Sequence, residues 1–190
     1  MKYHLLSIGL AIGLLGCNKY AEVPAPERPA TWASPIENEH VSNFHRVSDG
    51  LYRGAQPDEE GMAELERLGI KTVLNLRKHH TNEEELEGRQ LKSMRVRMSP
   101  ADVGDEHVVA FIKIVTDPAN RPVYFHCMYG SDRTGAMCAA WRVVVEGWEK
   151  EEALREMQGG GFGAHEIYEG LPDYIRSMDV AKIRAAAGLR

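Results

Sequence analysis

From Asn43 onward, strand-like and helix-like segments alternate along the chain. The segments with the apolar content of a strand are residues 44–47, 51–53, 71–76, 94–98 and 122–126. The first two flank Ser48-Asp49-Gly50, which is a typical turn sequence, so they predict a hairpin. Residues 71–76 and 122–126 are short apolar runs, and such runs are typical of strands that are buried on both faces.

Helical patterns occupy the intervals between these strands. Met62, Leu65 and Leu68 recur at three-residue spacing, and Gly69 ends that helix. Further helices are expected from Thr81 onward, from Asp105 to near Pro118, and over residues 133–146, 149–157 and 172–187. Because strands and helices alternate, the pattern predicts an α/β fold, a compact domain with a central, mostly parallel sheet flanked by helices. In such sheets, functional residues gather at the carboxyl ends of the strands.

The first residues follow a different pattern, with Lys2 ahead of the apolar run 5–15. A helix of that length rises only about 16 Å, roughly half of the hydrocarbon core of a bilayer. A charged start and a short apolar run are typical of a secretory signal peptide, which we expect over residues 1–16. The sequence Leu14-Leu15-Gly16-Cys17 resembles the lipobox of bacterial lipoproteins, and this resemblance implies cleavage before Cys17 and acylation of Cys17. The alternative is a plain signal peptide beside an incidental cysteine.

Residues 17–42 contain four of the nine prolines and lack a burial pattern. Such a segment favours extended conformations, so we interpret it as a tether between the lipid anchor and a folded domain of residues 43–190. Trp32 either docks on that domain or stays exposed in the tether. The lipobox resemblance further implies an exported protein, anchored at the periplasmic face of a bacterial membrane. Asn18 stands where inner-membrane lipoproteins typically have Asp, which favours the outer membrane.

Composition then limits the classes of function. The chain has 190 residues, of which 43% are hydrophobic and 27% charged, with a formal net charge of −5. These values exclude a multi-span membrane protein, a collagen and a disordered chain, and an acidic chain without clustered Lys and Arg is not expected to bind nucleic acid. Three cysteines cannot form a disulfide framework. Cys138 lies inside a predicted helix, so we expect it to pack in the core and not to reach Cys127.

Unusual chemistry is concentrated where the strand ending at His126 meets the following helix. Cys127 begins this connection, and the backbone N–H groups and positive dipole at the start of the next helix form an anion site. Gly130 allows the connecting loop to turn back so that these N–H groups converge. The helix dipole and Arg133 both favour the thiolate of Cys127. Arg133 can also donate two hydrogen bonds to two phosphoryl oxygens, as a lysine cannot.

The loop resembles the signature of the cysteine-based protein phosphatases, in which His-Cys is followed by five residues, an Arg and a hydroxyl residue. Residues 51–57 and 69–77 also look like the opening of compact bacterial and atypical dual-specificity phosphatases. The resemblance extends over residues 44–160. It implies hydrolysis of phosphate monoesters through a cysteinyl-phosphate, without a metal or a cofactor.

The resemblance also implies a role for the residues of this loop. Cys127 attacks phosphorus, and Arg133 with the backbone N–H groups of the loop holds the phosphoryl oxygens. His126 is expected to fix the conformation of the loop and support the thiolate, and Thr134 to bond the thiolate and help it leave. The residues expected to form the phosphate-binding loop itself are Met128, Tyr129, Gly130, Ser131 and Asp132.

The leaving oxygen needs a proton, which an Asp on a separate loop supplies in this family. Asp102 follows the strand over residues 94–98 and fits such a loop best. Asp105 precedes a helix and has a structural explanation as its N-cap. Asp132 lies inside the phosphate-binding loop, where its geometry towards the leaving group is open. Asp102 is therefore the expected general acid, with Asp105 and Asp132 as alternatives.

A run of four basic residues, Arg77-Lys78-His79-His80, directly follows a predicted strand and so belongs to the same sheet edge as the Cys127 loop. We interpret Arg77 and Lys78, joined by Arg53, as a basic rim that attracts anionic substrates, with a plain solvated loop as the alternative. No third ligand lies at a spacing that would make His79 and His80 a metal site.

The leading hypothesis is therefore a lipid-anchored phosphatase of the dual-specificity type, acting on a phosphorylated protein or another phosphate monoester. An inositol-polyphosphate phosphatase is the second hypothesis, which the His-Cys-x-x-Gly-x-x-Arg-Thr pattern and the basic rim suit. Asp132 and the lack of a lysine in the loop argue against it. A rhodanese-like sulfurtransferase is disfavoured by Thr134. A non-catalytic phosphate-binding module is disfavoured by the intact Cys127, Arg133 and available Asp.

Overall fold

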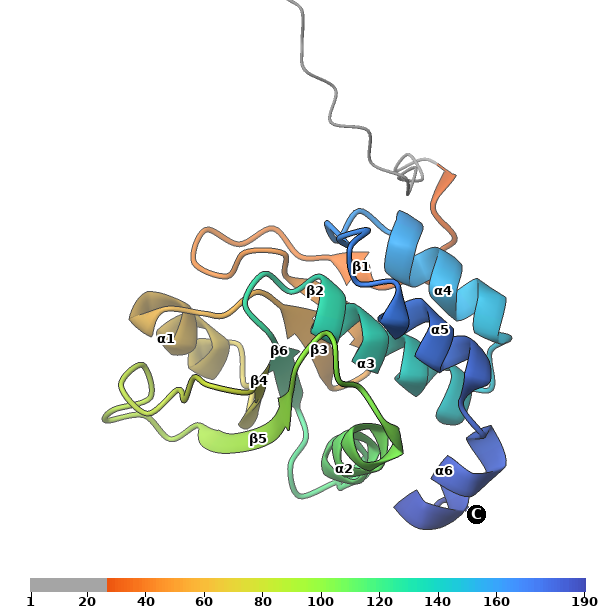
Figure 1. The fold of residues 1–190 in the computed structure, drawn as a ribbon. Coiled ribbons are helices and arrows are strands. Elements are labelled where there is room, and N and C mark those ends of the chain that lie inside the picture. The colour runs from red at the N-terminus through yellow and green to blue at the C-terminus, as the bar shows by residue number, and fades with distance from the viewer. Residues whose placement is uncertain (1–26) are drawn as a thin grey trace, which may run out of the picture.

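The computed structural model describes residues 27–190, which form a six-stranded sheet covered by helices (Figure 1). The strands are β1 (Ser34–Pro35), β2 (His45–Ser48), β3 (Leu51–Gly54), β4 (Thr72–Arg77), β5 (Lys92–Met98) and β6 (Val123–His126). The helices are α1 (Glu59–Arg67), α2 (Asp105–Thr116), α3 (Asp132–Val144), α4 (Lys150–Gly159), α5 (Gly170–Ser177) and α6 (Val180–Ala187). The strands lie in the order β1-β2-β3-β6-β4-β5.

The parallel part of the sheet positions the site. β1, β2 and β3 pair antiparallel, with β2 and β3 forming the predicted hairpin, whereas β3, β6, β4 and β5 run parallel. The carboxyl ends of these four strands therefore lie at one edge of the sheet. That edge carries Gly54 from β3, His126 from β6, Arg77 from β4 and Met98 from β5. The predicted α/β fold, a central sheet flanked by helices, is confirmed.

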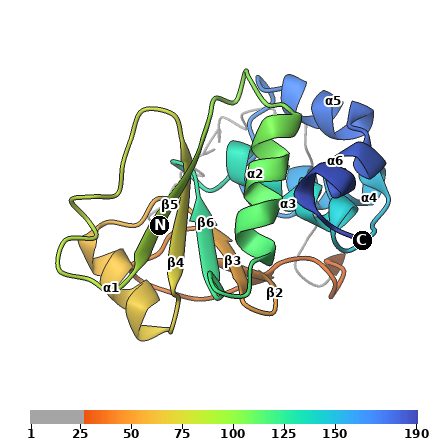
Figure 2. The ribbon, with the colours of Figure 1, turned by 90° about the horizontal axis from the view of Figure 1, so that it is seen from below.

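Two apolar cores lie on opposite faces of the sheet. α1 covers one face, and α2 to α6 gather on the other (Figure 2). Successive residues of a strand point to opposite faces, so Leu74 and its partner Phe125 enter the large core, while Val73 and its partner Tyr124 enter the small one. α3 is buried along nearly its whole length. The loop between β6 and α3 is therefore held by two buried elements.

Two predicted helices differ from the structure. The residues after Thr81 form turns instead of a helix, because the Asn82 side chain points inward to bond His126 and the segment has no apolar stripe to bury. The helix expected over residues 172–187 is divided into α5 and α6. The division occurs where Asp179 caps α6 by accepting a hydrogen bond from the backbone N–H of Lys182 (3.0 Å).

The segment before β2 belongs to the folded domain, which corrects the predicted boundary at residue 43. Trp32, Ala33 and Val41 are buried, and β1 pairs with β2. Trp32 thus docks on the domain, which was one of the two alternatives. The sequence pattern did not predict this packing because its partners are distant in sequence. The backbone N–H of Ala33, for example, donates to Oε1 of Glu156 on α4 (2.5 Å).

The expected signal peptide over residues 1–16 and the expected lipid anchor, Cys17, lie outside the described residues. The beginning of the expected tether lies outside them as well. Within residues 27–190, no helix is both long enough and apolar enough to cross a membrane.

Candidate active site

The loop that is expected to bind phosphate connects β6 to α3 and brings Cys127 to the N-terminal end of α3. Cys127 directly follows β6 and is only 2% exposed. Gly130 has a φ of 74°, and a Cβ at this position would lie 2.5 Å from the carbonyl carbon of Gly54 at the end of β3. Glycine is therefore needed for the loop to approach β3 this closely. The N–H of Gln56 donates to the carbonyl oxygen of Met128 (3.0 Å), which ties the loop to the segment after β3.

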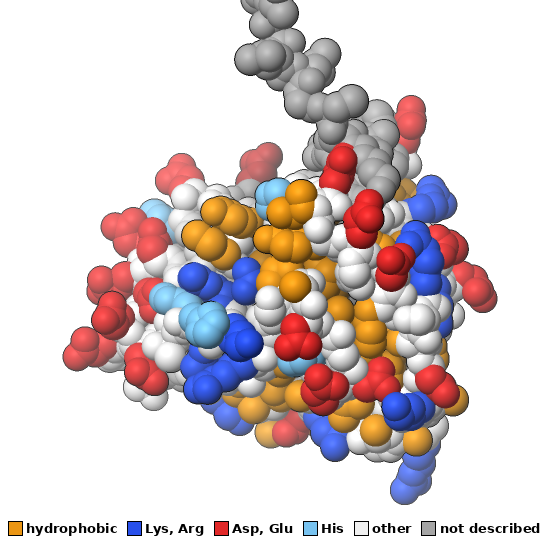
Figure 3. Space-filling model, viewed as in Figure 1, with side chains coloured by type: hydrophobic (Ala, Val, Ile, Leu, Met, Phe, Trp, Pro, Cys, Tyr) orange, Lys and Arg blue, Asp and Glu red, His pale blue; other side chains and the backbone are white. Residues whose placement is uncertain are grey.

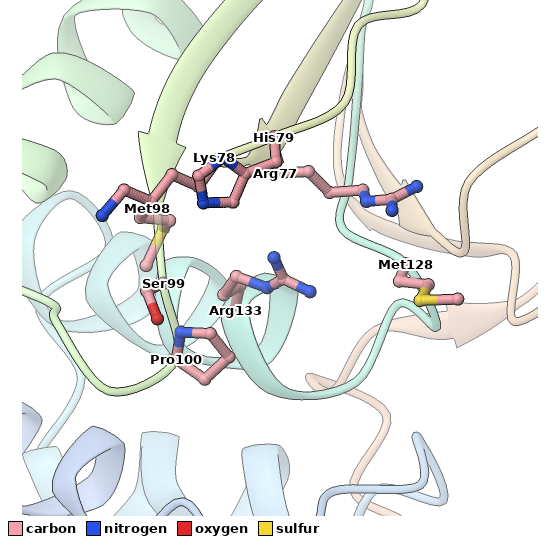
Figure 4. Close-up of a pocket in the computed structure, with 8 residues that line it drawn as sticks. All are labelled: Arg77, Lys78, His79, Met98, Ser99, Pro100, Met128 and Arg133. Carbon is pink, nitrogen blue, oxygen red and sulfur yellow. The ribbon is translucent and has the colours of Figure 1, made fainter.

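Arg133 faces the cavity beside this loop (Figure 4). The cavity has a volume of about 310 Å³. Its lining residues come from the ends of β4 and β5, the phosphate-binding loop and α3: Arg77, Lys78, His79, Met98, Ser99, Pro100, Met128 and Arg133. The Nε of Arg133 is buried and has no hydrogen-bond partner within residues 27–190. A phosphoryl group in the cavity would accept hydrogen bonds from this guanidinium.

His126 is buried beneath the loop and is held as a neutral ring. Its Nδ1 bonds the carbonyl oxygen of Cys127 (2.8 Å), and because that oxygen only accepts, Nδ1 carries the hydrogen. Its Nε2 accepts from Nδ2 of Asn82 (2.8 Å). Burial lowers the pKa of His126 to about 4, so the ring is uncharged at neutral pH. Through the Cys127 carbonyl, His126 makes the kind of loop-fixing contact that the sequence led us to expect of it.

Two buried asparagines, absent from the predicted site, extend this network to the basic segment. Nδ2 of Asn75 donates to Oδ1 of Asn82 (2.8 Å) and to the carbonyl oxygen of His80 (3.1 Å). Oδ1 of Asn75 accepts from the backbone N–H of Arg77 (2.7 Å). A signal for Asn75 is present in the sequence, since an amide inside the apolar strand β4 needs hydrogen-bond partners. Asn82 lies in a polar segment and carries no such signal.

The basic rim is only partly as predicted. Arg77 and Lys78 line the cavity together with His79. On the face seen in Figure 3, Lys, Arg and His side chains gather beside a hydrophobic patch. Arg53 is fully buried, and its Nη2 donates to the carbonyl oxygen of Gly130 (2.6 Å). Arg53 is therefore not part of an exposed rim, because β3 directs its side chain beneath the phosphate-binding loop.

Two of the candidate general acids follow β5: Asp102 lies in the connection to α2, and Asp105 lies at the start of α2. Asp102 is exposed, and its backbone N–H donates to the carbonyl oxygen of Ser99, which lines the cavity (3.1 Å). Asp105 is the first residue of α2, and its N-cap is Gly104, so the expectation that Asp105 is the cap was wrong. With Asp105 as its cap, α2 would begin at Glu106, but the helix already begins at Asp105.

The carboxylates of Asp105 and Asp132 both have structural partners. Asp105 accepts from Nζ of Lys182 (2.7 Å) and from the hydroxyl of Tyr174 (3.0 Å), and these two bonds lower its pKa. A carboxyl with a lowered pKa is a poor proton donor at neutral pH. Asp132 is buried and accepts from the backbone N–H (2.8 Å) and from Nδ1 (2.9 Å) of His165. These contacts leave Asp102 as the most available of the three acids.

The remaining loop residues divide between the interior and the surface. Oγ1 of Thr134 is buried without a hydrogen-bond partner in the described part of the chain, so the expected bond from Thr134 to the Cys127 sulfur is not formed in this structure. Ser131 is buried, and its hydroxyl donates to Oδ2 of Asp132 (3.3 Å). Met128 and Tyr129 are 44% and 60% exposed. They give the loop an apolar outer surface.

The third cysteine lies in the large core. Cys138 is on α3, and burial raises the pKa of its thiol to about 11. It is therefore protonated and unreactive at neutral pH, and it packs in the core as predicted. Cys127 and Cys138 are both free thiols.

This geometry agrees with comparisons of the chain with known proteins. The family described as a DSP-PTPase phosphatase fused to NAD+ kinase matches residues 30–169. The chain is also 36% identical over 186 residues to the dual specificity protein phosphatase TpbA of Pseudomonas aeruginosa, covering 96% of this chain and 83% of that protein. The chain belongs to the dual-specificity protein phosphatase family.

Solved structures of similar proteins support the membership of this phosphatase in the family. A TpbA variant of P. aeruginosa in complex with pTyr has a TM-score of 0.76 at 32% identity, covering 85% of this chain and 98% of that one. The core catalytic domain of the PP-IP phosphatase SIW14 from S. cerevisiae, in complex with citrate, has a TM-score of 0.70 at 25% identity, covering 80% and 94%. As a dual-specificity phosphatase, the protein hydrolyses phosphate monoesters through a cysteinyl-phosphate intermediate.

Proposed function

We propose that Cys127 is the nucleophile of this phosphatase, that Arg133 binds the phosphoryl group and that Asp102 is the general acid. The observation that carries this assignment is the position of Cys127 between β6 and the start of α3, beside a cavity lined by Arg133 with its unpaired Nε. Backbone N–H groups at the start of α3 add donors for the phosphoryl oxygens. Charge that develops on the phosphoryl group therefore meets a positive site.

The reaction proceeds in two steps. In the first, the sulfur of Cys127 bonds to phosphorus as the bond to the leaving oxygen breaks, and Asp102 gives its proton to that oxygen. In the second, a water molecule gives a proton to Asp102 and its oxygen bonds to phosphorus, while the phosphorus–sulfur bond breaks and its electron pair returns to sulfur. The buried hydroxyl of Thr134 stabilises the departing thiolate, and His126 holds the loop through the Cys127 carbonyl.

Phosphotyrosine-containing proteins are the substrates that we infer first. Met128 and Tyr129 on the phosphate-binding loop are 44% and 60% exposed, and an aromatic ring carrying the phosphate can pack against them. The complex of the TpbA variant with pTyr supports the same substrate class for this chain.

An inositol polyphosphate is the second candidate substrate, and the basic side of the cavity favours it. Arg77, Lys78 and His79 line the cavity together with Arg133, and several cations around one cavity suit a ligand with several phosphates. The likeness to SIW14, a PP-IP phosphatase, supports this candidate.

Phosphate release from three substrates separates the two candidates: a phosphotyrosine peptide, a phosphoserine peptide and inositol hexakisphosphate. We expect the highest kcat/KM for the phosphotyrosine peptide, and a higher value for inositol hexakisphosphate would favour the second candidate. Cys127→Ser and Arg133→Lys should each lower turnover by about 10³-fold or more. Cys138→Ala, which removes the thiol in the core, is the control and should keep turnover near the parent value. Parent-like turnover in Cys127→Ser would exclude the proposed nucleophile.

For the location, we propose that the protein is exported and anchored to a bacterial membrane by a lipid on Cys17. Lys2, the apolar run 5–15 and the lipobox-like Leu14-Leu15-Gly16-Cys17 support this proposal. In a bacterial host given a labelled fatty acid, the full-length protein is expected to carry the label and to appear in the membrane fraction. Cys17→Ala is expected to lose both properties. A label retained by Cys17→Ala would exclude Cys17 as the anchor.

A further inference from the structure

Arg53 is a buried cation without a carboxylate partner among the described residues. The residue is fully buried, its Nη2 donates to the carbonyl oxygen of Gly130 (2.6 Å), and its guanidinium also lies against the thiol of Cys138, which burial keeps neutral. Its Nε and Nη1 atoms are buried without a partner within residues 27–190. Burying a charge is costly unless the charge is paired, so the presence of Arg53 beneath the phosphate-binding loop needs a physical explanation.

Arg142 shows how this protein otherwise accommodates a buried arginine. Its Nε and Nη2 donate to the carboxylate of Glu156 (2.7 and 2.8 Å), and its Nη1 donates to Glu146 (2.7 Å). The charge of Arg142 is thus compensated inside the core. Arg53 contacts a carbonyl oxygen and the face of Phe162, with its guanidinium 3.8 Å from the centroid of that ring. These contacts orient the guanidinium of Arg53 but do not neutralise it.

The bond from Arg53 to Gly130 affects the direction of an N–H group in the loop. In a planar trans peptide, the C=O of Gly130 and the N–H of Ser131 point in opposite directions. Because Arg53 holds the Gly130 oxygen on its own side, the N–H of Ser131 is directed away from Arg53. The close approach of Gly130 to Gly54 shows that the loop is pressed against β3 at this point. Arg53 therefore sets the orientation of one of the peptides that form the loop.

The carboxylate of Glu156, which like Arg53 acts on His45 and Cys138, is already paired with Arg142, and the other neighbours of Arg53 do not supply a negative charge. His45 packs edge-on against the Phe162 ring (4.8 Å between centroids), and burial lowers its pKa to about 4, so it is neutral. Burial raises the pKa of Tyr124 well above its ordinary value, so this phenol is neutral too. Arg28, which contacts the same Phe162 ring at 5.5 Å, adds a positive charge. An anion bound by the phosphate-binding loop would supply the negative charge that these neighbours lack.

We propose that Arg53 is a positioning residue for the phosphate-binding loop, holding the Gly130–Ser131 peptide and placing a positive charge behind the bound phosphoryl group. This inference rests on the proposed function of the Cys127 loop and deepens it, because Arg53 acts through the loop without touching the substrate. Charges interact strongly across the poorly polarisable interior of a protein. The buried guanidinium and the bound phosphate therefore stabilise each other.

The test measures binding of inorganic phosphate by calorimetry in the Cys127→Ser background, so that it does not depend on turnover. Arg53→Met removes the charge and the bond to Gly130, and it is expected to weaken phosphate binding about tenfold or more. Arg53→Lys keeps the charge and a donor, and it is expected to bind phosphate within about threefold of the parent. Arg28→Met is the matched control. It removes the other guanidinium that contacts Phe162, and its phosphate affinity is expected to equal that of the parent.

Phosphate binding by Arg53→Met at the parent affinity would overturn this proposal. An equal loss in Arg28→Met would overturn it as well, because it would indicate a general disturbance around Phe162. Thermal unfolding is followed in parallel, and if Arg53→Met does not fold, Arg53→Lys decides: a loss of about tenfold in that variant would exclude the role of the charge. Failure of this test leaves the roles of Cys127 and Arg133 intact, since turnover measurements test those separately.

Discussion

At the scale of single residues, Asp102 and Asp105 differ in whether their proton is available. Lys182 and Tyr174 bond the Asp105 carboxylate and lower its pKa, whereas Asp102 is exposed and bonded to Ser99 of the cavity wall only through its backbone. We expect Asp102→Asn to lower kcat by about 10²-fold or more for a poor leaving group, because general acids contribute that much. Asp105→Asn is the matched control and should keep kcat near the parent value.

Steady-state turnover of p-nitrophenyl phosphate and phenyl phosphate checks this assignment. The loss in Asp102→Asn should be larger for phenyl phosphate, because phenolate is the poorer leaving group and depends more on the proton. If Asp105→Asn shows this dependence on the leaving group and Asp102→Asn does not, then Asp102 is not the acid.

Two buried histidines, His45 and His126, make the stability of the protein depend on pH. Burial lowers the pKa of each to about 4, from 6.5 in the unfolded chain. The unfolded chain therefore binds more protons between these values, so stability is complete above pH 6.5 and falls as the pH drops towards 4. At about pH 5, each histidine is expected to reduce the free energy of unfolding by about 2 kcal/mol relative to neutral pH.

Urea unfolding at about pH 7 and about pH 5 measures this loss, and His45→Gln isolates the share of one histidine. His45 lies on β2, outside the phosphate-binding loop, so the variant tests stability apart from the site. We expect the variant to lose roughly half of the histidine-dependent change. The same pH dependence in the variant and the parent would show that His45 is not the cause.

At the scale of elements, the segment between α4 and α5 holds the phosphate-binding loop from outside. Asp132 at the start of α3 accepts two hydrogen bonds from His165 in that segment (2.8 and 2.9 Å). Nδ2 of Asn43 donates to the carbonyl oxygens of both Tyr129 and Phe162 (3.0 Å each), which joins the same two parts. Asp132→Ala is expected to release the segment and to lower kcat/KM about tenfold, because small displacements of catalytic groups are costly.

Hydrogen exchange over residues 160–169, together with kcat/KM for two aryl phosphates, tests this contact. Exchange should be faster in Asp132→Ala than in the parent. The loss of kcat/KM should be the same for a good and a poor leaving group, as expected of a positioning contact. A larger loss for the poor leaving group would instead identify Asp132 as the general acid. Parent-like exchange would show that Asp132 does not hold the segment.

The elements that the sequence predicts well are those whose causes are local. β6 and α3, with the loop between them, follow from one continuous stretch that contains an apolar run, a turn glycine and a helix. The segment after β4 forms turns, and the prediction of a helix there was wrong. The cause is the hydrogen bond between Asn82 and His126, which lies 44 positions away. Arg53 was assigned to the rim for a similar reason, since its partner Gly130 is 77 positions away. Patterns along the chain do not contain such long-range hydrogen bonds.

At the scale of the whole molecule, the described part of the Pro-rich segment, residues 27–42, is part of the catalytic domain. β1 adds a strand to the edge of the sheet, and Trp32 and Val41 are buried. Nη1 of Arg28 donates to the carbonyl oxygen of Gly160 (2.6 Å). Gly160 lies two residues before Phe162, whose ring packs on Arg53. The family match also begins inside this segment, at residue 30. The folded domain therefore includes residues that a boundary at 43 would remove.

Truncation tests this placement of the boundary. A chain of residues 27–190, which contains every residue that the structure describes, is the reference. A chain of residues 43–190 should lose about 3 kcal/mol or more of the free energy of unfolding, because it no longer buries Trp32 and Val41. It also exposes the edge of β2, which β1 covers, and should aggregate more readily. Equal unfolding midpoints for residues 27–190 and 43–190 would restore the boundary that the prolines predicted, and would make the packing of Trp32 irrelevant to stability.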